Sequence, residues 1–110
     1  MISKKDRKKV KELMGAILVL ESRGEAERFF RDLLTESELI EFGNRWKAAR
    51  MLSEGVLYTK IEEETGLSST TVARVSKWLN NGKNGYKLVL SRVKLSTKHH
   101  NLSPAGKGLC

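Results

Sequence analysis

Apolar residues recur along this chain at intervals of three and four, which is the spacing of one face of an α-helix. Three segments show this pattern clearly, at residues 3–21, 26–34 and 39–52. No segment alternates strictly between apolar and polar residues, as a half-buried strand would. The only proline is Pro104, so almost the whole chain is free of helix-breaking proline. The sequence therefore predicts an all-α fold.

Polar and glycine residues indicate where the helices begin and end. The run 22–24 interrupts the first periodic segment. Thr35 and Glu38 have the spacing of a capping box, in which each side chain accepts a hydrogen bond from the backbone amide of the other residue. Gly55 is placed to end the third helix.

The apolar stripes are wider than one small domain needs. The chain has 110 residues, which fits a single domain. Short chains bury only a small share of their surface alone, so we expect residues 1–93 to form a helical homodimer, with a monomeric bundle as the alternative. From Lys94 to the end the sequence is polar and lacks periodicity, which predicts a flexible basic tail over 94–110.

Two further features limit the class of protein. The longest apolar run, 16–20, is too short to span a bilayer, and no signal-peptide pattern follows the basic N-terminus. We therefore expect a cytoplasmic protein without a membrane partner. Cys110 is the only cysteine, which excludes an internal disulfide and a cysteine metal site. Neighbouring histidines at 99–100 lack further ligands nearby, so no metal is expected.

Charge is distributed unevenly along the chain. All 13 acidic residues lie within 1–64, where 13 Lys and Arg balance them. The whole net charge of +8 therefore comes from residues 65–110. A region of one sign favours a polyanionic partner, because Lys and Arg release condensed counterions when they meet phosphates. The cationic residues of this region are Arg74, Lys77, Lys83, Lys87, Arg92, Lys94, Lys98 and Lys107.

The segment 58–79 has the pattern of a helix-turn-helix. Ile61 faces the core from a short first helix, and Gly66 is placed to turn the chain, because glycine adopts φ > 0 without steric cost. The second helix presents Val72, Val75 and Leu79 at spacings of three and four. Buried aliphatic residues at these positions fix how the two helices cross.

The second helix begins with hydroxyl side chains that are small enough to enter a groove. Ser68 is placed to be its N-cap, and amides at a helix N-terminus favour phosphate oxygens. The face opposite Val72 and Val75 carries residue types that contact base edges and phosphates, and two lysines beyond the helix can reach the DNA backbone. The predicted DNA-binding residues are Ser68, Ser69, Thr70, Thr71, Ala73, Arg74, Lys77, Lys83 and Lys87.

A wider set of residues forms a pattern that a known family shares. The set consists of the segment from Leu34 and Thr35 to Gly43 and Arg45, the single residues Gly66, Thr71, Arg74 and Leu79, and the run 81–90. With these residues the chain resembles the Trp repressor family, and in particular its YerC/YecD-type branch, over about 33–93. The resemblance implies a Trp-repressor-like intertwined helical dimer. Its two recognition helices would be spaced for successive major grooves of double-stranded DNA.

In the Trp repressor family, an amino-acid corepressor binds between the third helix and the recognition helix. By position, Thr35, Arg45 and Arg74 match the residues that line that site. Val75 stands where a glycine leaves room for the indole, and Trp78 stands where a small polar residue contacts the ligand amine. The resemblance therefore implies a vestigial pocket. We expect DNA binding without tryptophan and without a cofactor, and leave open whether another small-molecule effector binds.

Two arrangements of Trp78 fit these substitutions. Its indole, together with the Val75 methyl groups, fills the pocket from within, or it packs against the closing helix near Tyr86 so that no pocket forms.

Two other functions remain compatible with the sequence. A nonspecific nucleoid or RNA-associated protein would also need a basic surface. A small helical dimeric enzyme could bind a dicarboxylate through Arg28, Arg31, Arg45 and Arg50, but this leaves the acid-free region unexplained. We therefore predict a bacterial, sequence-specific transcriptional regulator that represses by occlusion, and not an enzyme.

Overall fold

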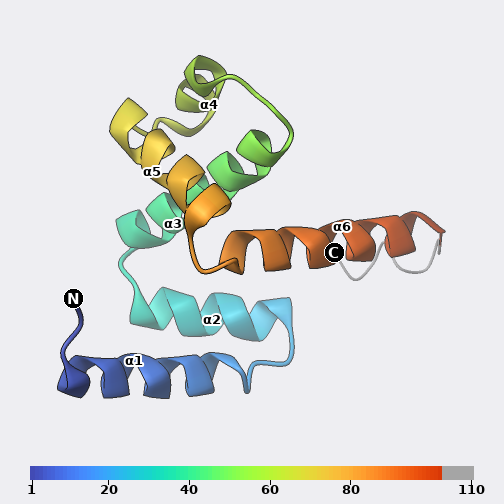
Figure 1. Cartoon of the computed structure of the whole chain (residues 1–110). Helices are drawn as coiled ribbons and strands as arrows, with labels where there is room; N and C mark the ends of the chain where they lie inside the picture. Colours follow the sequence, from blue (N-terminus) through green and yellow to red (C-terminus); the bar gives the residue numbers. More distant parts are fainter. Residues whose placement is uncertain (103–110) are drawn as a thin grey trace. The chain divides into compact units, whose positions relative to one another are not determined.

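The computed structural model describes residues 1–102 of the chain, and side chains as far as Lys94. Every regular element within this part is a helix, as the sequence predicts (Figure 1). The helices are α1 (Lys4–Ile17), α2 (Arg23–Leu33), α3 (Glu36–Ser53), α4 (Tyr58–Thr65), α5 (Ser69–Asn81) and α6 (Gly85–Leu102). None of these helices has the length and apolar character that a membrane crossing requires.

The chain folds as two compact units, which divide within α3. The first unit is Met1–Ile40 and the second begins at Glu41. The expectation of one domain over 1–93 stays a prediction.

Side-chain caps define the helix starts in the first unit. The Ser3 hydroxyl accepts a hydrogen bond from the backbone of Asp6 at the start of α1, at 3.1 Å. Ser22 caps α2 in the same way. The sequence predicts a break over 22–24, but only Ser22 lies outside the helix, because its cap allows α2 to begin directly at Arg23. α1 ends at Ile17, four residues before the predicted boundary at Glu21.

The predicted capping box at the start of α3 is confirmed. The backbone amide of Glu38 donates to the Thr35 hydroxyl at 3.1 Å, and the Thr35 amide donates to the Glu38 carboxylate at 2.9 Å. Hydrogen bonds from the backbone and the side chain of Thr35 lower the pKa of Glu38, and the bond from the backbone has the larger effect. The charged form of Glu38 is thereby favoured where it also meets the positive end of the helix dipole.

Apolar side chains remain uncovered on the first unit. Neither α1 nor α2 buries a residue in the single chain. Val10 and Met14 of α1 are exposed, and Leu18, directly after this helix, is 83% exposed. The stripe that the sequence predicts therefore forms, but it is only partly covered: Leu13 and Ile17 are half-buried, and no member is fully buried.

The second unit has a small, closely packed core. Ala48 and Ala49 of α3 are fully buried, and their short side chains let other helices approach the α3 backbone. The other members of the core come from α4, α5 and the turn between them. They are Ile61, Leu67, Val72 and Val75. Burial of each of these larger side chains contributes on the order of 1.5–3 kcal/mol to folding.

α6 is longer than the sequence predicts. The predicted tail over 94–110 overlaps this helix, which continues through Leu102. The structure corrects this boundary for a simple reason: no glycine or proline interrupts the chain between Tyr86 and Ser103. The next proline, Pro104, disfavours helical geometry at the residue before it, which matches an end at Leu102. Residues 103–110 lie outside the described part of the chain.

The connection between α5 and α6 depends on one glycine. The amide of Gly82 donates to the carbonyl of Trp78 at 2.9 Å and closes the last turn of α5. A Cβ atom at this position would collide with that same backbone carbonyl. Gly85, at the first turn of α6, has open space where a Cβ would stand.

We therefore expect Gly82→Ala to lower the free energy of unfolding by about 1–3 kcal/mol, because backbone atoms must move to relieve the collision. Gly85→Ala is the matched control. It should be neutral or stabilising by up to about 1 kcal/mol, since it only restricts the unfolded chain. Urea denaturation of both variants at one protein concentration checks the difference, and equal stability of the two would contradict it.

Candidate nucleic-acid interface

The turn between α4 and α5 is built as the helix-turn-helix pattern predicts. Gly66 adopts a left-handed conformation with φ of +73°, and its amide donates to the Glu62 carbonyl at 2.8 Å. A Cβ at this glycine would stand in open space, so the backbone conformation and not crowding calls for glycine. Gly66 thus ends α4 and redirects the chain toward α5.

Thr65 has a part in this turn that the helix-turn-helix pattern does not predict. Thr65 is buried, its hydroxyl donates to the Ile61 carbonyl at 2.7 Å, and it accepts from the Leu67 amide at 3.2 Å. It therefore connects the last turn of α4 to the loop. Its position directly before the turn glycine was the available signal, because threonine hydroxyls often bond to nearby backbone groups.

Hydroxyl groups organise the start of α5. The Ser68 hydroxyl accepts from the Thr71 amide at 3.1 Å, which confirms Ser68 as the N-cap. The same hydroxyl donates to the Thr71 hydroxyl at 3.0 Å. Ser68 and Thr71 are thus occupied with capping. Ser69 and Thr70 are exposed between them.

α5 separates its residues into a buried and an exposed face. Successive residues of an α-helix are rotated by about 100°, so the predicted reading residues fall on the side away from the buried stripe. Val72, Val75 and Leu79 are all buried. Thr70, Ala73, Arg74 and Lys77 lie opposite and are all exposed. Ser69 lies nearer one flank of this face.

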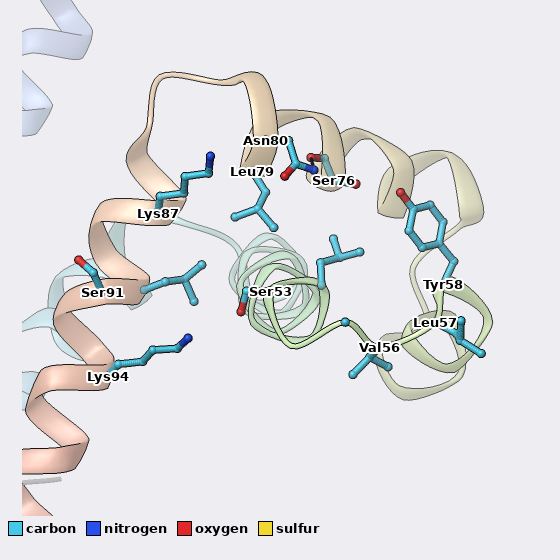
Figure 2. Close-up of a pocket in the computed structure, with 13 residues that line it drawn as sticks. Ser53, Val56, Leu57, Tyr58, Ser76, Leu79, Asn80, Lys87, Ser91 and Lys94 are labelled. Atoms are coloured by element: carbon cyan, nitrogen blue, oxygen red, sulfur yellow. Dashed lines mark hydrogen bonds between the residues drawn. The ribbon is translucent and has the colours of Figure 1, made fainter.

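The two lysines beyond α5 do not border the same hollow. Lys83 lies in the connection to α6 and borders a hollow with Trp46, Trp78 and Tyr86. Lys87 extends from α6 toward α5 (Figure 2) and lines a different hollow, which Leu79 also lines. Both lysines are exposed.

The acidic residue Glu64 is neutralised by two lysines of the same unit. Its carboxylate lies 3.4 Å from Lys47 of α3 and 3.5 Å from Lys60 of α4. Hydrogen bonds from Lys47 and then Lys60 lower the pKa of Glu64. This ion-pair group connects α3 to α4. The two lysines thereby compensate the negative charge of Glu64, which is the last acidic residue before the acid-free region.

The residues that match the family corepressor site differ in burial. Val75 is fully buried in the core, whereas Trp78 is 45% exposed. Arg45 forms an ion pair with Glu41, one helical turn earlier in α3, at 3.3 Å, and Arg74 is exposed on α5. Thr35 belongs to the first unit, where it caps α3.

Trp78 borders the aromatic hollow near the start of α6. Within this hollow, the rings of Trp46 and Tyr86 are stacked with centroids 6.4 Å apart. Burial raises the pKa of Tyr86, while the nearby positive charge of Arg45 acts in the opposite direction. Both arrangements of Trp78 that the sequence suggests stay predictions.

Comparison with known proteins adds a family and relatives to this geometry. The model of the family described as Trp repressor protein matches residues 8–94. The protein YerC of Bacillus subtilis (strain 168), whose function is uncharacterized, is 44% identical over 93 residues. This match spans 84% of this chain and 89% of YerC.

Solved structures show the same fold. A TrpR-like protein from Eubacterium eligens superimposes with a TM-score of 0.75 at 39% identity, over 79% of this chain and 90% of that protein. A protein from Staphylococcus aureus also has a TM-score of 0.75, at 34% identity, over 84% of this chain and 96% of the other.

Proposed function

The chain belongs to the Trp repressor family, and from this premise we propose that it is a sequence-specific DNA-binding regulator of transcription. The observation that carries the proposal is the exposed face of α5. Thr70, Arg74 and Lys77 lie there, opposite a stripe that anchors the helix in the core. No Asp or Glu occurs anywhere from residue 65 onward.

In this proposal α5 lies in the major groove of double-stranded DNA. Thr70 and Arg74 contact base edges, with Arg74 suited to a guanine through two parallel hydrogen bonds. Ser69, near the helix N-terminus, and Lys77 contact phosphates, and Ala73 leaves room for close approach to a thymine methyl group. Lys83 and Lys87 add backbone contacts that are independent of sequence.

Such a protein acts by occupying its site and excluding other proteins, which makes it a repressor in the cytoplasm. It carries out no chemistry, needs no cofactor and is not an enzyme. A nonspecific nucleoid or RNA-associated protein is the competing function, because the same positive charge would serve it. The two functions differ in whether the side chains on the α5 face discriminate between sequences.

Thr70→Ala and Arg74→Ala should each weaken binding to the preferred duplex by about 1–3 kcal/mol, because each loses a base contact. Binding to a scrambled duplex should change much less. Lys83→Ala is the contrasting variant, and it should weaken binding to both duplexes about equally and reduce the salt dependence. Fluorescence anisotropy at several salt concentrations, on a site found by selection from random duplexes, measures all three variants.

The outcome that contradicts this reading face is a Thr70→Ala, Arg74→Ala double variant with unchanged site preference and affinity. If the unmodified protein bound all duplexes equally, the nonspecific function would replace the proposed one.

We also propose that the protein is a homodimer. The support comes from the first unit, where α1 and α2 bury no residue and Val10, Met14, Leu18 and Val19 are exposed. Monomeric soluble proteins rarely expose apolar side chains in such density, because water contact with them is unfavourable. A second copy is the partner always present at the same concentration, and two recognition helices would read a symmetric site.

A dimer predicts that the midpoint of thermal unfolding rises with protein concentration, since association stabilises only the folded state. Sedimentation equilibrium should give twice the chain mass of 12.4 kDa at micromolar concentration. A mass of 12.4 kDa under these conditions would exclude the dimer.

Regulation by tryptophan is not part of the proposed function. Val75 occupies the position where the family has room for an indole, and here its side chain belongs to the buried core. Trp78 adds further bulk one turn along α5. A ligand at this place would have to displace packed side chains, which costs more than filling an empty pocket.

Titration with L-tryptophan should therefore produce no binding heat, and DNA affinity should be the same with and without it. Trp78→Ser distinguishes the two arrangements of this side chain. If the Trp78 indole fills the pocket, its removal should weaken DNA binding, and added indole should partly restore it. Val75 is left unchanged in this test, since its loss would open the core. Saturable tryptophan binding that tightens DNA binding would restore the corepressor function.

A further inference from the structure

A hollow of about 670 Å³ lies in the second unit, away from the exposed face of α5 (Figure 2). It is bordered by the end of α3, the start of α4, the last turns of α5 and the middle of α6. Its volume lies within the range of about 300–1,000 Å³ that small-molecule sites occupy. It is too large for a single inorganic ion.

The base of this hollow is apolar. Leu52 of α3, Leu79 of α5 and Leu90 of α6 line it, and the last two are buried. Such a surface contributes affinity for an apolar group by removing it from water, at about 25 cal/mol per Å². DNA, whose outer surface is charged and polar, does not match these leucines.

Cationic groups stand on one side of the hollow. Lys87 and Lys94 extend from α6 toward α5 and the end of α3 (Figure 2). They are seven residues apart, or two helical turns, so they share one face of α6. Their flexible four-carbon stems let both ammonium groups approach one ligand.

No carboxylate competes for these lysines inside the hollow. None of its lining residues is acidic, and no ion pair within the described part of the chain involves Lys87 or Lys94. Two cations beside an apolar base are complementary to a molecule that is anionic at one end and apolar at the other.

We propose that this hollow binds an amphipathic organic carboxylate, with its charged end at Lys87 and Lys94 and its apolar body on Leu52, Leu79 and Leu90. We favour a small molecule as the occupant because of the charge complementarity and the volume of the hollow together. A second copy of the chain seated in the hollow is the alternative occupant, and the test below separates the two.

The hollow also borders the proposed recognition helix. Ser76 and Asn80 of α5 line it, and the side-chain amide of Asn80 donates to the backbone carbonyl of Ser76 at 2.9 Å (Figure 2). Lys87 is in addition a proposed phosphate contact. A carboxylate held by Lys87 competes with a DNA phosphate for the same ammonium group, so the ligand acts as an inducer that releases DNA. This consequence alone rests on the proposed function.

The test uses the full chain and octanoate as the probe, with 1-octanol as the uncharged analogue of equal length. Backbone amide shifts in NMR spectra report the site, without DNA present. Octanoate should give saturable shifts around residues 52–58, 76–80 and 87–94, and octanol should bind at least about fivefold more weakly. Lys94→Gln should weaken octanoate binding by about fivefold, because one of two cations is lost.

Arg92→Gln is the matched control, since it removes an equal charge from α6 at a residue that does not line the hollow. Its octanoate affinity should equal that of the unmodified protein. The proposal is overturned if octanoate shifts do not saturate, if octanol binds equally well, or if the two variants weaken binding equally. Absence of octanoate binding in a protein that sediments as a dimer also overturns the proposal and favours the second copy as the occupant of the hollow.

A separate arm adds the selected duplex. Octanoate should raise the apparent Kd for DNA in the unmodified protein and much less so in Lys94→Gln. If DNA is not bound at all, the proposed function fails while the octanoate result stands by itself. If DNA is bound and octanoate has no effect on it, the inducer role is overturned.

Discussion

The packing of two alanines on α3 is the constraint on which the candidate site depends. Ala48 and Ala49 are fully buried, and they belong to one core cluster with larger side chains of α4 and α5. These larger side chains are Ile61, Val72 and Val75. Because protein interiors are packed almost as densely as crystals, the buried side chains of α5 fix the rotation of this helix about its own axis. This rotation in turn decides which residues of α5 remain exposed.

One short helix thus serves three surfaces. Its exposed face carries Thr70, Arg74 and Lys77, and its two flanks border different hollows. Trp78 lies on the flank with the aromatic rings of α3 and α6, whereas Asn80 lies on the flank with the lysines of α6. A ligand in the second hollow would contact the proposed recognition helix without occupying its reading face. In our proposals, Lys87 belongs to both sites, so a bound ligand would act on DNA binding through a shared residue.

Charged side chains are distributed differently in the two units of the chain. Two carboxylates of the second unit are held in local ion pairs, Glu41 with Arg45 and Glu64 with Lys47 and Lys60. Beyond Glu64 every formal side-chain charge is positive at neutral pH. The first unit, with nine Lys and Arg against eight Asp and Glu, is instead nearly neutral and exposes apolar side chains. These two surfaces are the ones to which we assign the proposed second copy of the chain (the first unit) and the proposed DNA (the surface of α5).

Local chemistry was enough to predict much of this molecule from its sequence. Helix type, the Thr35–Glu38 capping box, the Gly66 turn and the Ser68 cap depend on residues within a few positions of each other, so their pattern is visible in the chain. The helical extension of α6 to Leu102 was missed, because a polar segment without an apolar stripe can still propagate a helix when no glycine or proline interrupts it. The unequal burial of Val75 and Trp78 and the hollow beside Lys87 and Lys94 were also beyond the sequence. They arise where α3, α4, α5 and α6 meet, and only three-dimensional packing decides which side chains close a space and which leave it open.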